Sequence, residues 1–281
     1  MSDEARTRRR QAEPEGPAYS APALEKGLDI LELLCRSDAP LSQKEIALRL
    51  GRTVGELYRM VTCLAERGYL ATVDDKFVVT TKLFELAHLN PPTHRLLVEA
   101  APIMQRLSDG LDQSCHLTVY NRGRQIVIAK VDAPSGMGFS VRQGAELDVM
   151  VSASGRVLPA FQDKETRDLR IAESVERRPE HADQQISATL DMIRARGFES
   201  IPSVQVRGLY AVAFPILDTR SHAIAALTVP YAERIDLLNR TSVATVETQL
   251  AEAASALTDR LGGKPSGLSR STTIGGSVQA D

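Results

Sequence analysis

Apolar and polar positions alternate with helical spacing near the start of the chain. Leucines recur every three or four residues, and charged residues such as Glu25, Asp29 and Glu32 lie between them. Because this period matches one face of an α-helix, the pattern predicts a first amphipathic helix that ends before Pro40. Its apolar positions are Leu24, Leu28, Leu31 and Leu34.

Two helix start signals follow within a short distance of each other. Ser42 with Glu45, and Thr53 with Glu56, each form a capping box, in which the hydroxyl accepts a backbone N–H and the carboxylate returns to the cap. Gly51 lies between the two predicted helices. Short helices joined by a tight glycine-containing turn are typical of a helix-turn-helix, although any three-helix unit uses similar caps.

A β-hairpin is predicted directly after the third helix. Two short apolar runs, Tyr69-Leu70 and Phe77-Val78-Val79, flank Asp74 and Asp75, which are turn residues. A helix-turn-helix followed by such a hairpin, or wing, predicts a winged DNA-binding domain.

The third predicted helix is the one expected to meet DNA bases in the major groove. Arg52 and Arg59 are seven residues apart and lie on one side of it, where guanidinium groups reach guanine or phosphate. Glu56 has two interpretations, since it can accept from cytosine or serve only in its capping box. The candidate DNA-binding residues, of which the lysines and Arg49 are phosphate contacts or plain surface charges, are Lys44, Arg49, Arg52, Thr53, Gly55, Glu56, Tyr58, Arg59 and Lys76.

The pattern changes in the second part of the chain to short runs with a period of two. His116–Tyr120, Gln125–Val131 and Ile224–Val229 read as β-strands that alternate with helical segments. Pro91-Pro92 interrupts an apolar run and marks a domain boundary. The second domain is therefore predicted to mix helices and strands.

The second part of the chain carries residues that are typical of a small-molecule binding site. Ser152 and Ser154 precede a predicted helix whose free N–H groups suit a carboxylate or hydroxyl, although both serines serve equally well as plain caps. His116 is a candidate ligand contact that would make the response depend on pH near neutrality, with a satisfied core histidine as the alternative. Arg142 has two open interpretations, a ligand contact or an interface charge.

Composition limits the function classes. The chain has 281 residues, enough for two domains, and 34 Lys plus Arg against 36 Asp plus Glu give a net charge of −2. Residues 21–81 carry eight basic and nine acidic residues. The net charge of this domain therefore does not favour non-specific DNA binding, and DNA recognition depends on a local basic patch.

No catalytic or metal signal accompanies these features. The three cysteines match neither a disulfide framework nor a zinc site, and hydrolase and phosphate-loop motifs are missing. We expect no catalytic residues, no metal and no cofactor. Without an apolar run of about 18 residues, a cytoplasmic protein with no membrane partner is expected.

Several motifs in the expected order resemble the IclR family of bacterial transcriptional regulators. They are ALEKGLDILELL, LSQKEIALRLG, ELYRMVTCLAERGYL, VRQGAELDVMVSASGRVLPAF and GLYAVAFPILD. The resemblance implies an α+β protein with an N-terminal winged helix-turn-helix and a GAF-like α/β effector-binding domain. The expected limits are a disordered arm over 1–20, the DNA-binding domain over 21–81, a linker helix over 82–93, the GAF-like domain over 94–262 and a disordered tail over 263–281.

The resemblance also places the effector pocket, although the sequence departs from the family pattern there. Ala211 stands where many relatives have cysteine, Ile201 and Ser203 replace an acidic pair, and Arg156 replaces the usual lysine. Together with His116 and Ser152 from the chain itself, the candidate effector-binding residues are His116, Leu147, Ser152, Ala153, Ser154, Leu209, Ala211, Thr228 and Pro230.

The expected function is transcriptional regulation. A homodimer, with a dimer of dimers left open, binds double-stranded operator DNA and answers to a small-molecule effector, an organic acid or a sugar-derived compound. The alternatives are an enzyme that uses the second domain as a catalytic scaffold, and an architectural DNA-binding protein that needs no ligand.

Overall fold

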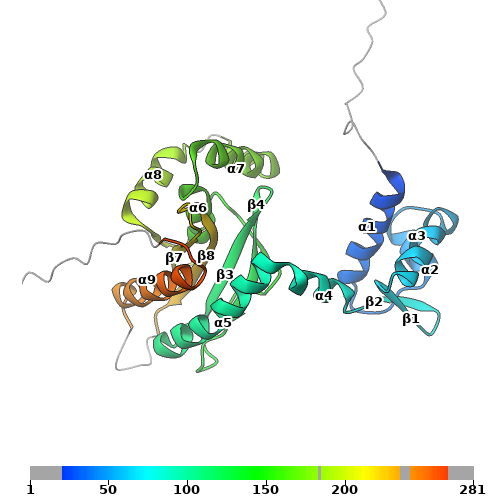
Figure 1. The fold of residues 1–281 in the computed structure, drawn as a ribbon, viewed down its shortest axis with the longest axis horizontal. Coiled ribbons are helices and arrows are strands. Elements are labelled where there is room, and N and C mark those ends of the chain that lie inside the picture. Colours follow the sequence, from blue (N-terminus) through cyan, green and yellow to red (C-terminus); the bar gives the residue numbers. More distant parts are fainter. Residues whose placement is uncertain (1–20, 183–184, 235–240, 265–281) are drawn as a thin grey trace, which may run out of the picture. The chain divides into compact units, whose positions relative to one another are not determined.

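The computed structural model describes residues 21–182, 185–234 and 241–264 and divides into two compact units, Met1–Asn90 and Pro91–Asp281 (Figure 1). The expected disordered arm over 1–20 lies outside the described residues, as does the expected tail from residue 265 onward. The two units are described one at a time.

The first unit contains three helices, a hairpin and a fourth helix. Its elements are α1 (Pro22–Cys35), α2 (Gln43–Arg49), α3 (Val54–Glu66), β1 (Leu70–Val73), β2 (Lys76–Val79) and α4 (Lys82–Leu89). β1 and β2 pair antiparallel, and Asp74 and Asp75 both have positive φ, +47° and +57°. Positive φ at both central residues is the geometry of a type I′ turn, one of the two common two-residue hairpin turns. The predicted winged helix-turn-helix order is therefore confirmed.

Both capping boxes form as predicted. The Ser42 backbone N–H donates to the Glu45 carboxylate at 2.7 Å, and the Thr53 backbone N–H donates to the Glu56 carboxylate at 2.9 Å. In return, each hydroxyl accepts the backbone N–H of its glutamate. Local hydrogen bonding thus fixes the first turns of α2 and α3.

The apolar face of α1 is only partly buried. Ile30 and Leu34 are buried in the three-helix core, whereas Leu24 is 63% and Leu28 is 50% exposed. The leucine periodicity therefore predicts the helix correctly, but its N-terminal half keeps an apolar surface that the first unit itself does not cover.

The boundary between the units lies inside the expected linker helix over 82–93. α4 ends at Leu89, Asn90 is extended, and α5 (Pro91–Leu111) begins at the two prolines. Proline is well tolerated in the first turn of a helix, where its missing N–H would have no partner in any case. Residues 91–93 therefore start a new helix of the second unit instead of continuing the linker.

The second unit is built on one six-stranded antiparallel sheet with the order β5-β4-β3-β8-β7-β6. Its strands are β3 (Cys115–Asn121), β4 (Arg124–Val131), β5 (Glu146–Leu147), β6 (Glu199–Pro202), β7 (Leu209–Leu217) and β8 (Ala223–Ala232). The three strands predicted from alternation are confirmed, as is the α+β class. Its other helices are α6 (Ala153–Ala160), α7 (Lys164–Arg177), the short 3₁₀ helix η1 (Pro179–His181), α8 (Ser187–Arg196) and α9 (Val243–Arg260).

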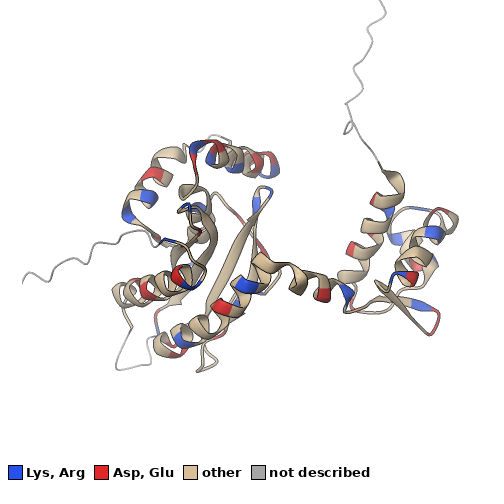
Figure 2. Cartoon of the chain, in the orientation of Figure 1, with Lys and Arg blue, Asp and Glu red and all other residues tan. Residues whose placement is uncertain are grey.

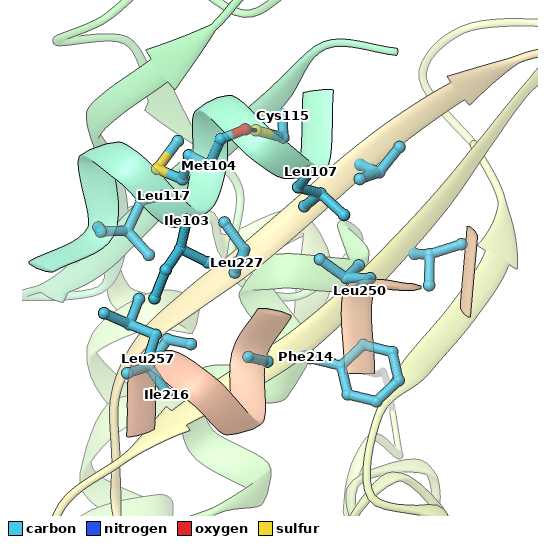
Figure 3. Packing of buried hydrophobic residues seen from close by; sticks show 14 of the residues in the cluster. Ile103, Met104, Leu107, Cys115, Leu117, Phe214, Ile216, Leu227, Leu250 and Leu257 are labelled. Atoms are coloured by element: carbon cyan, nitrogen blue, oxygen red, sulfur yellow. Dashed lines mark hydrogen bonds between the residues drawn. The ribbon is translucent and has the colours of Figure 1, made fainter. Parts of the chain in front are cut away.

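Helices cover both faces of this sheet, and strand alternation sorts the side chains between them. α5 and α9 pack on one face, where Leu117, Phe214 and Leu227 meet Met104 and Leu250 (Figure 3). Burial of such large apolar side chains stabilises each by about 1.5–3 kcal/mol. Cys115 faces this core as expected for a small apolar residue, with its thiol directed at the Met104 carbonyl.

The opposite face of the sheet carries smaller side chains and is covered by α6 and α8. Ala211, Ala213 and Ala226 lie there, alternating with the large residues that point toward α5 and α9. Because these side chains are small, space remains between α6 and the strands on this face.

The folded part of the chain extends beyond the expected limit at residue 262. The Gly263 N–H donates to the Thr258 carbonyl at 2.9 Å, and a Cβ on Gly263 would lie 1.9 Å from the Leu217 carbonyl oxygen. The expected tail over 263–281 therefore begins too early, since Gly263 and Lys264 pack on the second unit. None of the helices in the described ranges combines the length and apolar character that crossing a membrane requires.

Candidate functional site

Helix α3 presents the expected reading side to solvent. Leu57 and Val61 are buried against the first unit's core, whereas Gly55 and Arg59 are exposed. Arg52 is exposed too, but it precedes the Thr53 N-cap of α3, so the expectation that it shares one side of this helix with Arg59 is wrong. Tyr58, which is 58% exposed, lies next to Arg59. Lys44 and Arg49 of α2, and Lys76 of the wing, are exposed as well. All nine candidate DNA-binding residues therefore lie on the surface of one small unit, where Figure 2 shows basic segments on its helices and wing.

Glu56 is engaged by the protein. Its carboxylate accepts from the Thr53 N–H and hydroxyl, both at 2.9 Å, and from Lys26 Nζ of α1 at 3.4 Å. These hydrogen bonds, chiefly the backbone one, lower the pKa of Glu56 to about 2. Of the two interpretations of Glu56, the capping role is the one that the geometry satisfies, because a cytosine would compete with three protein donors.

An apolar groove lies on the same unit between α1, α3 and α4. Its volume is about 670 Å³, and Leu24, Leu28, Cys63, Leu83 and Leu86 contribute to its wall. The exposed leucines of α1 described above form one side of it. We call this surface the α1–α3 groove.

The second unit contains a cavity of about 260 Å³ between the sheet and α6, on the face with the small side chains. All nine candidate effector-binding residues contribute to its wall. They come from β3, β5, β7, β8 and the first turn of α6, so the topology brings together segments that are far apart in sequence.

The first turn of α6 is held rigidly at the cavity. The Ser152 hydroxyl accepts the Gly155 N–H at 3.1 Å and also contacts the Asp148 carbonyl and the Gln125 amide. Ser152 is thus a true N-cap, whereas Ser154 is buried in the wall. A Cβ on Gly155 would lie 2.5 Å from the Asp148 and Val149 carbonyl oxygens, so only glycine allows this close approach.

His116 and Thr228 form the inner end of the cavity. They are direct partners across β3 and β8, and their exposed fractions are 4% and 2%. His116 Nε2 and Thr228 Oγ1 have no hydrogen-bond partner within the part of the chain that the structure describes. Burial lowers the pKa of His116 to about 4. The expected pH response near neutrality is therefore wrong for this histidine, which stays uncharged there.

Several residues of the wall were missed by sequence reasoning or left ambiguous. Phe139, Val204 and Val206 belong to loops that carry no periodic pattern, and only the fold brings them to the cavity. Arg142, for which two interpretations were open, lies in the wall with an exposed side chain. Over the described ranges, no group of three or more potential ligands is placed to hold a metal ion.

Two family models match the chain, one for each unit. The model described as the IclR helix-turn-helix domain matches residues 23–74, and the model described as the bacterial transcriptional regulator IclR C-terminal domain matches residues 92–259. The chain belongs to the IclR family of bacterial transcriptional regulators.

Curated relatives within the IclR family are regulators as well. The chain is 25% identical over 193 residues to the HTH-type transcriptional regulator KdgR of Dickeya chrysanthemi, covering 66% of this chain but 63% of that protein. It is 24% identical over 217 residues to the Pca regulon regulatory protein of Pseudomonas putida, covering 74% of this chain and 73% of that protein. These relatives are regulators and not enzymes, which argues against the catalytic alternative.

Solved IclR structures share the fold. The Thermotoga maritima IclR structure matches with a TM-score of 0.62 at 20% identity, covering 85% of this chain and 98% of that one. An IclR homolog from Microbacterium hydrocarbonoxydans, complexed with 4-hydroxybenzoate, matches with a TM-score of 0.68 at 21% identity and the same coverage. At these identities the likeness shows the architecture of the chain and leaves its ligand to be derived from its own residues.

Proposed function

We propose that this IclR-family protein binds double-stranded operator DNA through its first unit and changes its operator affinity when a small metabolite binds to the second. The observation that carries the proposal is the cavity whose wall contains all nine candidate effector residues, in a chain that also exposes a capped recognition helix. The exposed Arg52 and Arg59 supply base and phosphate contacts, and Lys44, Arg49 and Lys76 supply phosphate contacts.

A homodimer is the assembly that suits this function. One short recognition helix reads few base pairs, whereas two helices on a pseudo-palindromic operator roughly double the free energy available for discrimination. The α1–α3 groove supports this assembly, because it offers exposed apolar side chains from two helices of the first unit. A dimer of dimers is compatible with the same arrangement.

The effector is an organic acid or a sugar-derived compound. The first turn of α6 lines the cavity, where the positive end of its helix dipole favours a carboxylate or hydroxyl. The 4-hydroxybenzoate of the solved relative supports an organic acid. A ligand changes operator affinity only through its different affinity for two arrangements of the assembly. A tenfold release of DNA corresponds to about 1.4 kcal/mol of coupling, which one good hydrogen bond present in one arrangement supplies.

The deciding experiment is titration of the protein with DNA from its own upstream region at several salt concentrations. Replacing Arg59 by alanine is expected to weaken specific binding about five- to hundredfold, the effect of losing one base contact. Arg220→Ala, which removes an exposed arginine of the second unit, is the matched control and is expected to leave binding unchanged.

Two outcomes contradict the proposal. Unchanged specific binding by Arg59→Ala, or affinity that does not fall with added salt, excludes α3 as the recognition helix. A thermal-shift screen of organic acids and sugar acids then tests the effector role, since a ligand of the folded sensor raises its unfolding temperature. Operator affinity that no such ligand alters would favour the architectural alternative.

A further inference from the structure

The inner end of the cavity demands a hydrogen-bonding partner. His116 Nε2 and Thr228 Oγ1 are buried side by side on paired strands, and neither atom has a partner among the described residues. Each buried polar group left unpaired costs about 1–3 kcal/mol. Both groups can donate and accept, because the imidazole has two tautomers and the hydroxyl rotates. A ligand hydroxyl or carbonyl satisfies them.

The same end of the cavity is unsuited to a charged group. His116 is uncharged near neutrality, because burial lowers its pKa to about 4. Among the described residues of the wall, Arg142 is the one with a charged side chain, and its side chain is exposed. A carboxylate placed against His116 and Thr228 would lose its hydration without gaining a cation, which is costly.

The mouth of the cavity offers the opposite environment. The Arg142 guanidinium forms no hydrogen bond or ion pair with any described residue and remains available to an anion. Between the two ends the wall is largely apolar, with Leu147, Val151, Ile201 and Leu209 among its residues. The first turn of α6 adds the positive end of a helix dipole to this wall.

We propose that the effector is a small monocarboxylate with an apolar body and a hydroxyl or carbonyl group remote from its carboxylate. The cavity of about 260 Å³ lies at the small end of the range for ligand pockets. The uncharged group binds to His116 and Thr228, and the carboxylate lies at the mouth beside Arg142. This inference rests on the proposed function in assuming that the cavity is the effector site.

Matched probes test the assignment by calorimetry on the full chain. The aromatic series is benzoate, its para-hydroxy derivative and terephthalate, and the aliphatic series is hexanoate, its terminal alcohol and adipate. In at least one series the hydroxyl compound is expected to bind about tenfold more tightly than both the unsubstituted acid and the dicarboxylate, as one added hydrogen bond implies.

Three variants test which end of the ligand lies against which residues of the wall. Thr228→Val keeps the shape of the side chain and removes its hydroxyl, so it is expected to abolish the preference for the hydroxyl compound. His116→Phe is expected to do the same. Arg142→Gln is expected to weaken all monocarboxylates by a similar factor and to leave the preference intact.

Several results would overturn the inference. These are tightest binding by the dicarboxylate or by the unsubstituted acid, a preference that survives in Thr228→Val, or no binding in either series. Failure of the proposed function has a different signature. A hydroxyl compound that binds with the expected preference but leaves operator affinity unchanged contradicts effector control and not the ligand class.

Discussion

At the scale of single residues, the second unit separates two kinds of buried side chain by strand alternation. On β3, Cys115 and Leu117 face α5, whereas His116 faces the cavity. One-residue alternation is the reason that a polar pair can be buried beside a large apolar core without interrupting it. The consequence is a histidine held in a low-dielectric environment, where its charged form is disfavoured.

The pH dependence of stability provides a test of this environment. Because the folded-state pKa of His116 is lowered from 6.5 to about 4, the unfolded chain takes up the proton first as the pH falls. Folding stability is therefore lost as the pH falls from 6.5 toward 4. Between about pH 7 and about pH 4.5 the wild type should lose about 2 kcal/mol more than His116→Phe in urea unfolding. An equal loss in both proteins would show that His116 is not buried uncharged.

Which residues line the cavity could be predicted in part. The motif around Ser152 and the strand pattern at His116 leave local traces in the sequence, whereas the other seven candidate residues of the wall come from the resemblance to the IclR family. The neutral state of His116 could not be predicted, since it depends on α6 covering the strand. Phe139 and Val204 were missed because loop residues reach the cavity through tertiary structure alone.

At the scale of elements, the position of α6 depends on one close backbone approach. Gly155 in its first turn passes so near the 148–149 segment that any Cβ would meet two carbonyl oxygens at 2.5 Å. Backbone atoms cannot swing away as a flexible side chain does. The helix that forms the cavity wall is therefore fixed by a glycine as well as by the Ser152 cap.

Substitution of this glycine should destabilise the second unit. Gly155→Ala is expected to lower the free energy of unfolding by about 1–3 kcal/mol, the usual cost of overpacking. Gly110→Ala in α5 is the matched control, because its new Cβ would meet only the flexible end of Gln249 at 3.2 Å, and alanine favours helix. Thermal unfolding of both variants checks this, and equal stability would contradict the close approach.

Elements defined by local signals were the easiest part of the fold to predict. The two capping boxes and the aspartate turn act within three or four residues, so Ser42, Thr53 and Asp74 revealed helix starts and a hairpin from sequence alone. The break at Asn90 was harder. The two prolines predict a boundary at the place where the structure divides, between Asn90 and Pro91, but the sequence does not show that they also begin α5.

At the scale of the whole molecule, the exposed apolar half of α1 is the feature that calls for a partner. Leu28→Glu is expected to shift the protein toward monomers in sedimentation velocity and to weaken operator binding, because a charge in a buried apolar contact is costly. Leu48→Glu on α2 is the control for the sedimentation measurement, since Leu48 is 81% exposed and lies outside the wall of the α1–α3 groove.

The oligomeric state of the Leu28→Glu protein decides whether the α1–α3 groove is the subunit contact. Monomers that still fold, as judged by circular dichroism, support the groove as the subunit contact. A Leu28→Glu protein that remains dimeric assigns the contact to another surface. The sequence predicts the first helix, but the exposure that singles out its N-terminal half depends on the packing of all three helices.

The pairing of β3 with β8 also governs the order in which the two units can fold during synthesis. These central strands are more than a hundred residues apart in sequence, whereas the contacts of the first unit are local. During synthesis the DNA-binding unit is therefore expected to fold while β8 is still untranslated, since distant strands must wait for each other. Until β8 has been synthesised, one edge of β3 is unpaired. The nascent chain therefore contains a folded DNA-binding unit before it contains a folded effector-binding unit.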